Sequence, residues 1–592
     1  MRARNKLSIW AGILIGQLAM GCSTAGRGPG PSEFKPVESA MAPVSDGAPE
    51  GQATYHFSLG QSYALEGSAD KAIEEYKLAI VYDPSSAVIH TRLATEYVKR
   101  GLLTFAIEEC KTALSHDAKY SDARLLLAGL YGATKLVDEA LREYDTVLKH
   151  DPLNTETQKE VLVFKASLLI EENRPNEALP VLRQLLKLDP ESYLGHYYMG
   201  RARARQGDVT AAVASFKKSM ELKRGFSQAV LALGAMYEEK NRQMDAIRAY
   251  EEYFADARDE QVAARLAQLH LERNEYRKAL RYLQFLDRQE DDNLNVKVKI
   301  GLIHVELKEY RKAAVVFEDI LKRNAEAERV RFYLGSVYEE LKDYSKAIEV
   351  FRMVSPESSA YPDAAVHVGY LYKLHGDPKL ALEWIDKAIS QNGEVPGYHS
   401  FKASLVEEAD GVPAAIKVLE GAAGKFPREE KLLYYLGSLY DKTRDVEKAL
   451  TVMGAILEAN PDNANALNYV GYTLASRDER LDAAENMVRR ALEIRPEDGY
   501  IQDSLGFVLY KKGRTRDAIV ILEKAYRTKP SEPVIAEHLG DAYARHNLRS
   551  KALQKYLEAS KLYSDPAEKM KVEKKIDELQ GAGKRRVPAA QD

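Results

Sequence analysis

The sequence predicts an all-α solenoid, in which helix pairs stack one on the next, and three observations support this prediction. The 592 residues are too many for one compact core. One alanine position returns every 34 residues over most of the chain. Tyrosine dominates the aromatic residues, with 35 Tyr against 14 Phe and 2 Trp, which indicates that one large residue recurs at a fixed place in a repeated unit.

Residues 1–21 have the form of a lipoprotein signal peptide. Three cations precede the apolar stretch 7–20, which is too short to span a bilayer. The segment LAMGC resembles a bacterial lipobox, with Ala19 where leucine is usual. The resemblance implies cleavage before Cys22 and lipidation of this cysteine, and Ser23 after it implies the outer membrane. The alternative is an ordinary secretory signal in which Cys22 is an incidental thiol.

A flexible linker is predicted to follow the lipidated cysteine, so that residues 22–52 form one tether. The segment is rich in Gly, Pro, Ser and Ala and has almost no large apolar residue to bury. About thirty such residues have a root-mean-square span of about 30 Å. The folded part is therefore expected to stand off the membrane surface.

The repeated unit is predicted to fill residues 53–565. The marker alanine recurs at intervals of 34 within four runs, and steps of 38, 33 and 35 residues join the runs, so the unit occurs fifteen times. The members of the runs are Ala72, Ala106, Ala140; Ala178, Ala212, Ala246; Ala279, Ala313, Ala347, Ala381, Ala415, Ala449; and Ala484, Ala518, Ala552.

Each unit is predicted to hold two helices. In one unit Gly437 and Tyr440 lie three apart, and Ala449 and Met453 lie four apart, which places each pair on one helix face. A small residue suits a close crossing of two helix backbones, and a large residue fits where the next repeat leaves a pocket. Pro461 then ends the second helix.

This 34-residue pattern resembles the tetratricopeptide repeat. The resemblance implies a right-handed superhelix of about fifteen antiparallel helix pairs with a concave groove. A stack of this kind needs a solvating cap at its end, and residues 566–581 are predicted to be a capping helix. Residues 582–592 are expected to be a basic, disordered tail, either solvated or in contact with anionic lipid or cell wall.

Catalysis is not expected from this chain. No GxxxxGK[ST], HExxH, GxSxG or CxxC motif occurs. The net charge of -4 gives no general reason to expect nucleic-acid binding. We therefore expect no enzyme, no cofactor, no metal and no small-molecule substrate.

The histidines and the second cysteine are expected to be packing residues. His56 and His90 are 34 residues apart, as are His270 and His304, which indicates equivalent places in successive repeats. Cys110 occupies the place that tyrosine fills in the neighbouring units.

A binding function is expected from the groove. In tetratricopeptide repeats the fifth, ninth and twelfth residues of the first helix tend to face the concave surface, and aromatic residues there are good anchors for a partner. The alternative is that some of these rings pack between repeats. None of the ninth positions holds the asparagine of a chaperone carboxylate clamp. The candidate protein-binding residues are Phe332, Tyr370, Tyr434, Tyr472, Phe507 and Tyr510.

The block from Asn463 to Tyr526 is similar to a stretch in long tetratricopeptide-repeat lipoproteins of Gram-negative bacteria. That resemblance implies a lipid-anchored outer-membrane scaffold with its repeats in the periplasm. Its partners would be periplasmic or envelope proteins, namely a carboxyl-terminal processing protease and its cell-wall hydrolase substrates. The alternative is a pilotin-like or envelope-assembly factor for a secretin, pilus or polysaccharide-export complex.

Overall fold

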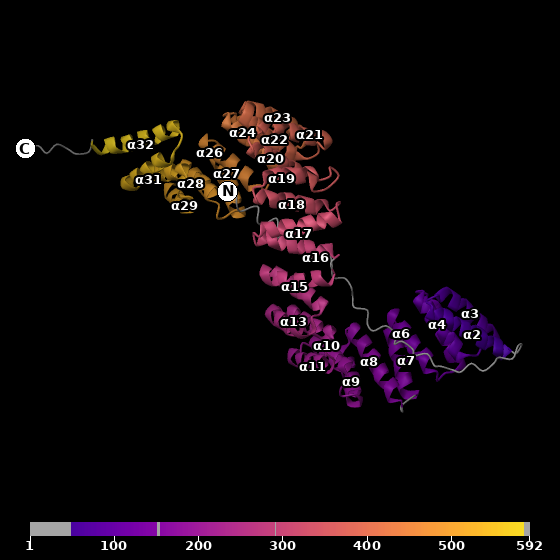
Figure 1. The fold of residues 1–592 in the computed structure, drawn as a ribbon. Helices are drawn as coiled ribbons and strands as arrows, with labels where there is room; N and C mark the ends of the chain where they lie inside the picture. The colour runs from indigo at the N-terminus through magenta and orange to yellow at the C-terminus, as the bar shows by residue number, and fades with distance from the viewer. Residues whose placement is uncertain (1–48, 151–153, 291, 585–592) are drawn as a thin grey trace, which may run out of the picture. The chain divides into compact units, whose positions relative to one another are not determined.

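The computed structural model describes residues 49–150, 154–290 and 292–584. These ranges contain 31 α-helices and no strand. Thirty of the helices form fifteen consecutive pairs and the last one, α32, follows them, which confirms the predicted all-helical solenoid with a terminal cap (Figure 1). Even-numbered helices from α2 to α30 are called first helices below, and their odd-numbered followers second helices.

Contacts divide the chain into two units, one ending at Val316 and the other beginning at Phe317, so the division falls within α17 (Tyr310–Arg323). The remaining helices of the first unit are α2 (Pro49–Leu65), α3 (Ala69–Tyr82), α4 (Ala87–Lys99), α5 (Leu103–His116), α6 (Ser121–Ala133), α7 (Val137–His150), α8 (Thr155–Glu171), α9 (Pro175–Leu188), α10 (Tyr193–Arg205), α11 (Val209–Leu222), α12 (Ser227–Glu239), α13 (Gln243–Ala257), α14 (Glu260–Glu272), α15 (Tyr276–Gln289) and α16 (Leu294–Glu306).

The second unit continues the same pattern of short helices. Its helices are α18 (Glu328–Glu340), α19 (Tyr344–Arg352), α20 (Tyr361–Leu374), α21 (Pro378–Gln391), α22 (Pro396–Asp410), α23 (Val412–Lys425), α24 (Glu430–Lys442), α25 (Val446–Ala459), α26 (Ala464–Ser476), α27 (Leu481–Ile494), α28 (Gly499–Lys511), α29 (Thr515–Thr528), α30 (Pro533–Arg545), α31 (Arg549–Leu562) and α32 (Pro566–Lys584).

The crossing of the two helices in a pair explains the recurring glycine. A Cβ built on Gly335 would lie 2.6 Å from the ring of Phe351, and one on Gly540 would lie 2.6 Å from the ring of Tyr556. Real Cβ atoms do not approach so closely, so the large side chain of the second helix fits only against a bare backbone. The small residue and the large residue are therefore in direct contact within one helix pair, whereas the sequence predicts that the large residue fills a pocket left by the next repeat.

Every pair turns through at least one residue with positive φ. In six pairs this residue is glycine, among them Gly101, whose φ is 74°, while other repeats use residues such as Lys135 at 64° and Arg444 at 60°. In the turn between α4 and α5, the N–H of Leu102 donates to the carbonyl of Tyr97 at 2.9 Å, and this hydrogen bond ends the first helix of the pair. The same bend therefore recurs with different residues.

The predicted cap, α32, completes the apolar core of the last pair. Val572 is fully buried and Ile576 is 8% exposed, and both join the cluster that contains Leu539 and Ala559. None of the described helices is long and apolar enough to cross a bilayer.

Candidate functional site

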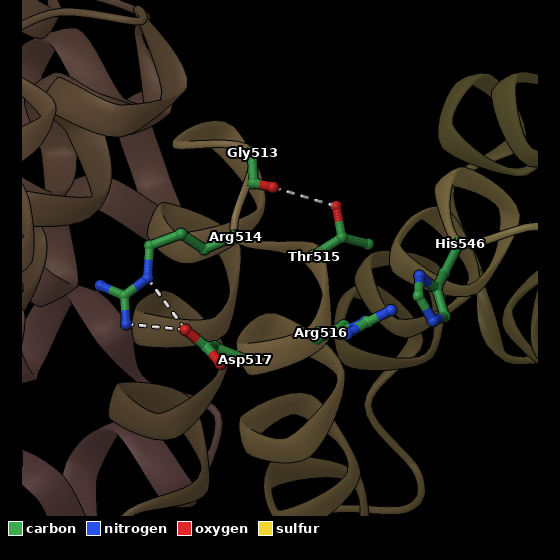
Figure 2. A pocket seen from close by; sticks show the side chains of 6 residues that line it. All are labelled: Gly513, Arg514, Thr515, Arg516, Asp517 and His546. Carbon is green, nitrogen blue, oxygen red and sulfur yellow. Dashed lines mark hydrogen bonds and ion pairs between the residues drawn. The ribbon is translucent and has the colours of Figure 1, made fainter.

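A pocket of about 370 Å³ lies beside the turn that joins α28 to α29 (Figure 2). It is lined by turn residues and by His546 at the end of α30. Arg514 pairs with Asp517, and Thr515 donates a hydrogen bond to the carbonyl of Gly513 at 3.5 Å. No hydrogen bond joins the side chain of His546 to Thr515 or Asp517 in the described part of the chain.

The first helices of the second unit form the inner layer of its stack. Helix α26 contacts α28, and α28 contacts α30, although each belongs to a different pair, and the second helices approach one another less closely. All six candidate binding residues lie on first helices of this unit, and they differ in environment.

Phe332 on α18 packs between repeats. Its ring centroid lies 5.5 Å from that of Phe351 and 5.7 Å from that of His367, and the side chain is half-buried against the local core. This placement corresponds to the packing alternative for this residue.

Tyr370 on α20 and Tyr434 on α24 are more open. Their exposed fractions are 39% and 38%, which are large values for aromatic rings on helices that contact their neighbours. Large exposed rings of this kind are the residues that most often anchor a partner protein. These two tyrosines are therefore the accessible members of the predicted set.

Tyr472 on α26 and Phe507 on α28 form an aromatic stack with His538 on α30. The Phe507 centroid lies 5.1 Å from that of Tyr472 and 4.5 Å from that of His538. Burial raises the pKa of Tyr472 to about 12. The predicted pair is thus brought together, and sequence reasoning missed His538, which stands in no 34-residue series.

Tyr510, the sixth candidate, lies near the end of α28. It is half-buried, and the guanidinium of Arg545 lies 4.0 Å from its ring centroid, within cation–π range. Arg545 also donates to the backbone carbonyl of Tyr510 at 2.6 Å. Its ring is therefore partly covered by a cation of the same chain.

A buried pair fixes the stacked imidazole. His538 Nδ1 lies 3.0 Å from both carboxylate oxygens of Asp503. Burial disfavours the imidazolium, but the carboxylates of Asp503, Asp541 and Glu537 raise the pKa of His538 above its ordinary value. The stack therefore contains an acid–base pair that bridges two first helices.

Two further carboxylates lie beside this pair and share one lysine. Lys575 of α32 donates to Glu537 at 2.7 Å and to Asp541 at 2.7 Å. Tyr563 donates to Glu537 at 2.7 Å, and Tyr556 donates to Asp541 at 2.7 Å. The cap is thus held to α30 by an ion-pair network.

The fifth, ninth and twelfth positions of α24, α26, α28 and α30 are called the inner strip. Four of its twelve residues are aromatic, four are Asp or Glu, and none is Lys or Arg. The inner strip consists of Tyr434, Ser438, Asp441, Asn468, Tyr472, Ala475, Asp503, Phe507, Tyr510, Glu537, Asp541 and Ala544.

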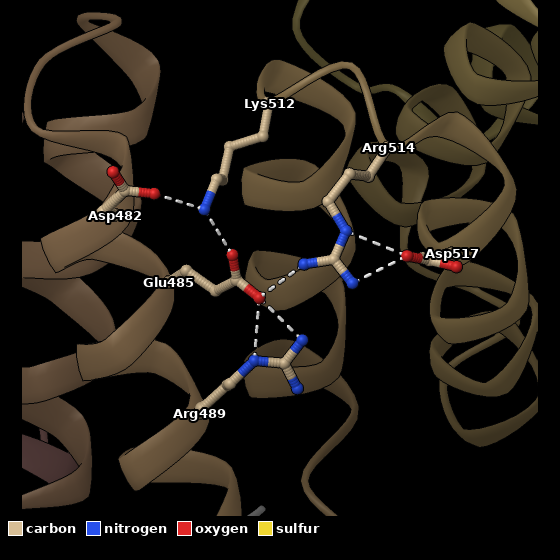
Figure 3. A network of polar contacts seen from close by, with 6 residues as sticks. All are labelled: Asp482, Glu485, Arg489, Lys512, Arg514 and Asp517. Atoms are coloured by element: carbon tan, nitrogen blue, oxygen red, sulfur yellow. Dashed lines mark hydrogen bonds and ion pairs between the residues drawn. The ribbon is translucent and has the colours of Figure 1, made fainter.

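A separate polar network centres on Glu485 of α27, which is 7% exposed (Figure 3). It accepts from Lys512 at 2.6 Å, Arg489 at 2.7 Å and Arg514 at 3.0 Å. Burial alone would raise its pKa, but the bonds from Lys512 and Arg489 lower the pKa of Glu485 to about 2. Asp482 and Asp517 balance the cations, so this network joins neighbouring elements.

The recurring histidines pair with glutamates, as a packing role predicts. His56 Nδ1 lies 2.7 Å from Glu75, and His304 Nδ1 lies 2.8 Å from Glu309. Within the described ranges no group of three His, Cys, Asp or Glu side chains is placed to hold a metal ion.

Cys110 is fully buried on α5, and burial raises the pKa of its thiol to about 12. It fills the place of Tyr76 and Tyr144 in adjacent pairs. Cys22, the predicted lipidation site, lies outside the described residues.

Models of the tetratricopeptide repeat match residues 53–86, 103–159, 165–225, 298–365 and 434–499. The TPR repeat-containing protein PA4667 of Pseudomonas aeruginosa is 32% identical over 165 residues, which are 27% of each chain. The BBSome complex member bbs-4 of Caenorhabditis elegans is 24% identical over 28% of this chain and 36% of its own. The alignments thus span about a third or less of these relatives.

Two solved structures are also similar at low sequence identity. The structure of Naa15/Naa10 bound to HypK-THB covers 91% of this chain and 98% of its own, with 14% identity and a TM-score of 0.32. The Pseudomonas aeruginosa pilF structure covers 35% of this chain and 92% of its own, with 17% identity and a TM-score of 0.30.

Proposed function

We propose that this chain, which contains tetratricopeptide repeats, is a non-catalytic scaffold that holds a partner protein on the inner strip of its second unit. One observation carries the proposal: the strip places exposed Tyr434 and the Tyr472–Phe507 stack on successive inner helices. Rigid aromatic side chains supply contact area at a low cost in conformational entropy. A helical scaffold fixes them better than loops would.

The finer proposal is an outer-membrane adaptor. Lipidated Cys22 would set the location, the linker to residue 52 would set the reach, and the repeats would bring a carboxyl-terminal processing protease to cell-wall hydrolases. Holding both proteins on one chain turns a weak encounter into an effectively intramolecular one. The lipobox resemblance and the similar block 463–526 support this proposal.

The adaptor role is tested by reconstitution. The purified chain is added to the processing protease of the same organism, and hydrolase cleavage is followed over time. Faster cleavage supports an adaptor, whereas an unchanged rate with no complex on size-exclusion chromatography contradicts it. Loss of secretin multimers after deletion of the gene would instead favour the envelope-assembly alternative.

The anchor is tested separately with Cys22→Ser. We expect the variant to leave the membrane fraction and to keep its helical circular dichroism, because acyl chains supply the membrane affinity and no packing. Cys110→Ser, which keeps the proposed lipid site, should remain with the membrane. A Cys22→Ser chain that still sediments with the outer membrane would refute the anchor.

A further inference from the structure

The inner strip differs in charge from the equivalent surface of the first unit. At the positions that correspond to the inner strip in the repeat register, the first helices α2 to α16 hold one acid, Glu238, and one base, Arg201. The four first helices of the inner strip hold four acids and no base at these positions. Acidic groups are therefore concentrated beside the aromatic rings of α24 to α30.

Among the described residues, part of this negative charge has no cation paired with it. Asp441 on α24 is exposed and accepts a hydrogen bond from the hydroxyl of Tyr469 at 2.8 Å. A phenol is neutral, so this hydrogen bond brings no positive charge to the carboxylate. Tyr434, also exposed, lies on the same helix.

The acids farther along the strip are also in excess. Glu537 and Asp541 together receive one ammonium group, that of Lys575. Asp503 faces His538, whose imidazole carries at most one positive charge. Three carboxylates thus meet one lysine and one histidine, and negative charge remains even when His538 is protonated.

Several cations at the edge of the strip already have partners within the chain. Lys442 pairs with Glu407 at 2.6 Å, and Lys511 pairs with Asp478 at 2.8 Å. Arg545 covers Tyr510. Two exposed cations lie near Tyr434, namely Lys431, one turn earlier on α24, and Arg495, which donates to the side-chain oxygen of Asn465 at 2.9 Å.

We infer that the inner strip takes a segment of its partner protein that is rich in lysine or arginine. This inference rests on the proposed scaffold function, and it adds the chemistry of the partner. Ammonium and guanidinium groups are attracted both by carboxylates and by the faces of aromatic rings. An acidic segment would meet repulsion at Asp441 and at the Glu537–Asp541 pair, so the charge also selects against it.

The test measures peptide binding to the purified chain by fluorescence anisotropy. The probe is a fluorescein-labelled peptide of about 15 residues in which lysine alternates with leucine and glycine, and its counterpart carries glutamate in place of lysine. We expect the lysine peptide to bind, and its affinity to fall as salt rises from about 50 to 300 mM, because salt screens the attraction between lysine and the carboxylates. Equal or tighter binding of the glutamate peptide overturns the inference.

Matched variants locate the binding. Asp441→Asn should lower the affinity for the lysine peptide about two- to fivefold, which is the effect expected from losing one exposed charge. The control is Asp482→Asn, an aspartate outside the strip that is 92% exposed and pairs with Lys512, and it should leave the affinity unchanged. Tyr434→Ala should also weaken binding. Equal effects of the two aspartate variants, or none, would overturn the inference.

The result is separable from that of the scaffold test. One outcome is that the chain activates the protease while the lysine peptide neither binds the strip nor competes with the protease or its substrate for the chain. In that case the charge inference fails and the scaffold function stands. If the lysine peptide binds through Asp441 while no envelope protein forms a complex, the proposed function fails and the strip's preference stands.

Discussion

His90 and Arg124 occupy the same place in successive repeats and make the same two contacts. His90 bonds to Glu109 at 2.6 Å and to the carbonyl of Pro84 at 3.1 Å. Arg124 bonds to Glu143 and to the carbonyl of Ala118 at 2.7 Å. Both partners of His90 are acceptors, so the doubly protonated imidazolium satisfies the site best.

His90→Arg is therefore expected to remove a pH dependence. The hydrogen bond to Glu109 raises the pKa of His90 above 6.5, although burial opposes it. Its stabilising contribution is complete below the unfolded value of 6.5 and is lost as pH rises through the higher folded value. The arginine variant should keep its thermal midpoint over this window, while the natural chain loses stability.

His375→Arg, at an exposed helix end, serves as the control, and its thermal midpoint should depend on pH as that of the natural chain does. His90→Ala should cost about 1–3 kcal/mol, because it removes a buried side chain and its hydrogen bond to a charged partner. A His90→Arg midpoint that falls with pH as steeply as that of the natural chain would contradict the assignment.

The sequence predicted packing roles for the recurring histidines because the 34-residue interval survives in a single chain. The partner glutamates carry the same signal, since Glu75, Glu109 and Glu143 also lie 34 apart. His538 could not be found in this way. Its role depends on Asp503, which lies 35 residues earlier at the fifth position of α28, where the first helix of one other repeat, α30, also holds an acid, Glu537.

At the scale of the helix pair, close crossing depends on a missing side chain. A Cβ on Gly234 would lie 2.0 Å from the ring of Tyr250, the tightest such approach in the described ranges. Gly129 is also helical, and a Cβ there meets nothing within 4 Å.

Gly234→Ala is expected to destabilise the α12–α13 pair by about 1–3 kcal/mol, as overpacking does. Gly129→Ala should instead be stabilising by about 0.5–1 kcal/mol, because alanine favours helix more than glycine does. Hydrogen exchange followed by mass spectrometry measures both changes pair by pair. If α12 and α13 are as well protected from exchange in the Gly234→Ala variant as in the natural chain, the ring of Tyr250 moves aside and the expected overpacking does not occur.

The turns mark the limit of prediction at this scale. Glycines such as Gly67 and Gly101 point to the left-handed bend, since glycine adopts it freely. Lys135 and Arg444 adopt the same backbone without any signal in their residue type, because the flanking helices impose it. The number of helix pairs could therefore be predicted from the alanine series, while individual turn residues could not.

At the scale of the whole chain, contacts in a solenoid are local. Each pair touches its neighbours, so stability is approximately a sum of unit and interface contributions. Trp384 on α21 reports on the second unit, where its indole N–H donates to the carbonyl of Ala365 at 3.0 Å. The other tryptophan, Trp10, lies outside the described residues.

In a Trp10→Phe chain, tryptophan fluorescence and far-ultraviolet circular dichroism should give different urea midpoints. Fluorescence follows α21 and its neighbours, while circular dichroism follows all the helices, and distant repeats need not unfold together. Superimposable curves throughout the transition would show that the chain unfolds as one cooperative body.

The buried thiol of Cys110 can report on local opening of the first unit. A thiol of such high pKa holds almost no thiolate at neutral pH, and its full burial excludes reagents. An aromatic disulfide reagent can therefore react only during the moments when α5 detaches from the stack. The rate at which Cys110 is labelled would therefore measure how often α5 detaches, and no probe needs to be added to the chain.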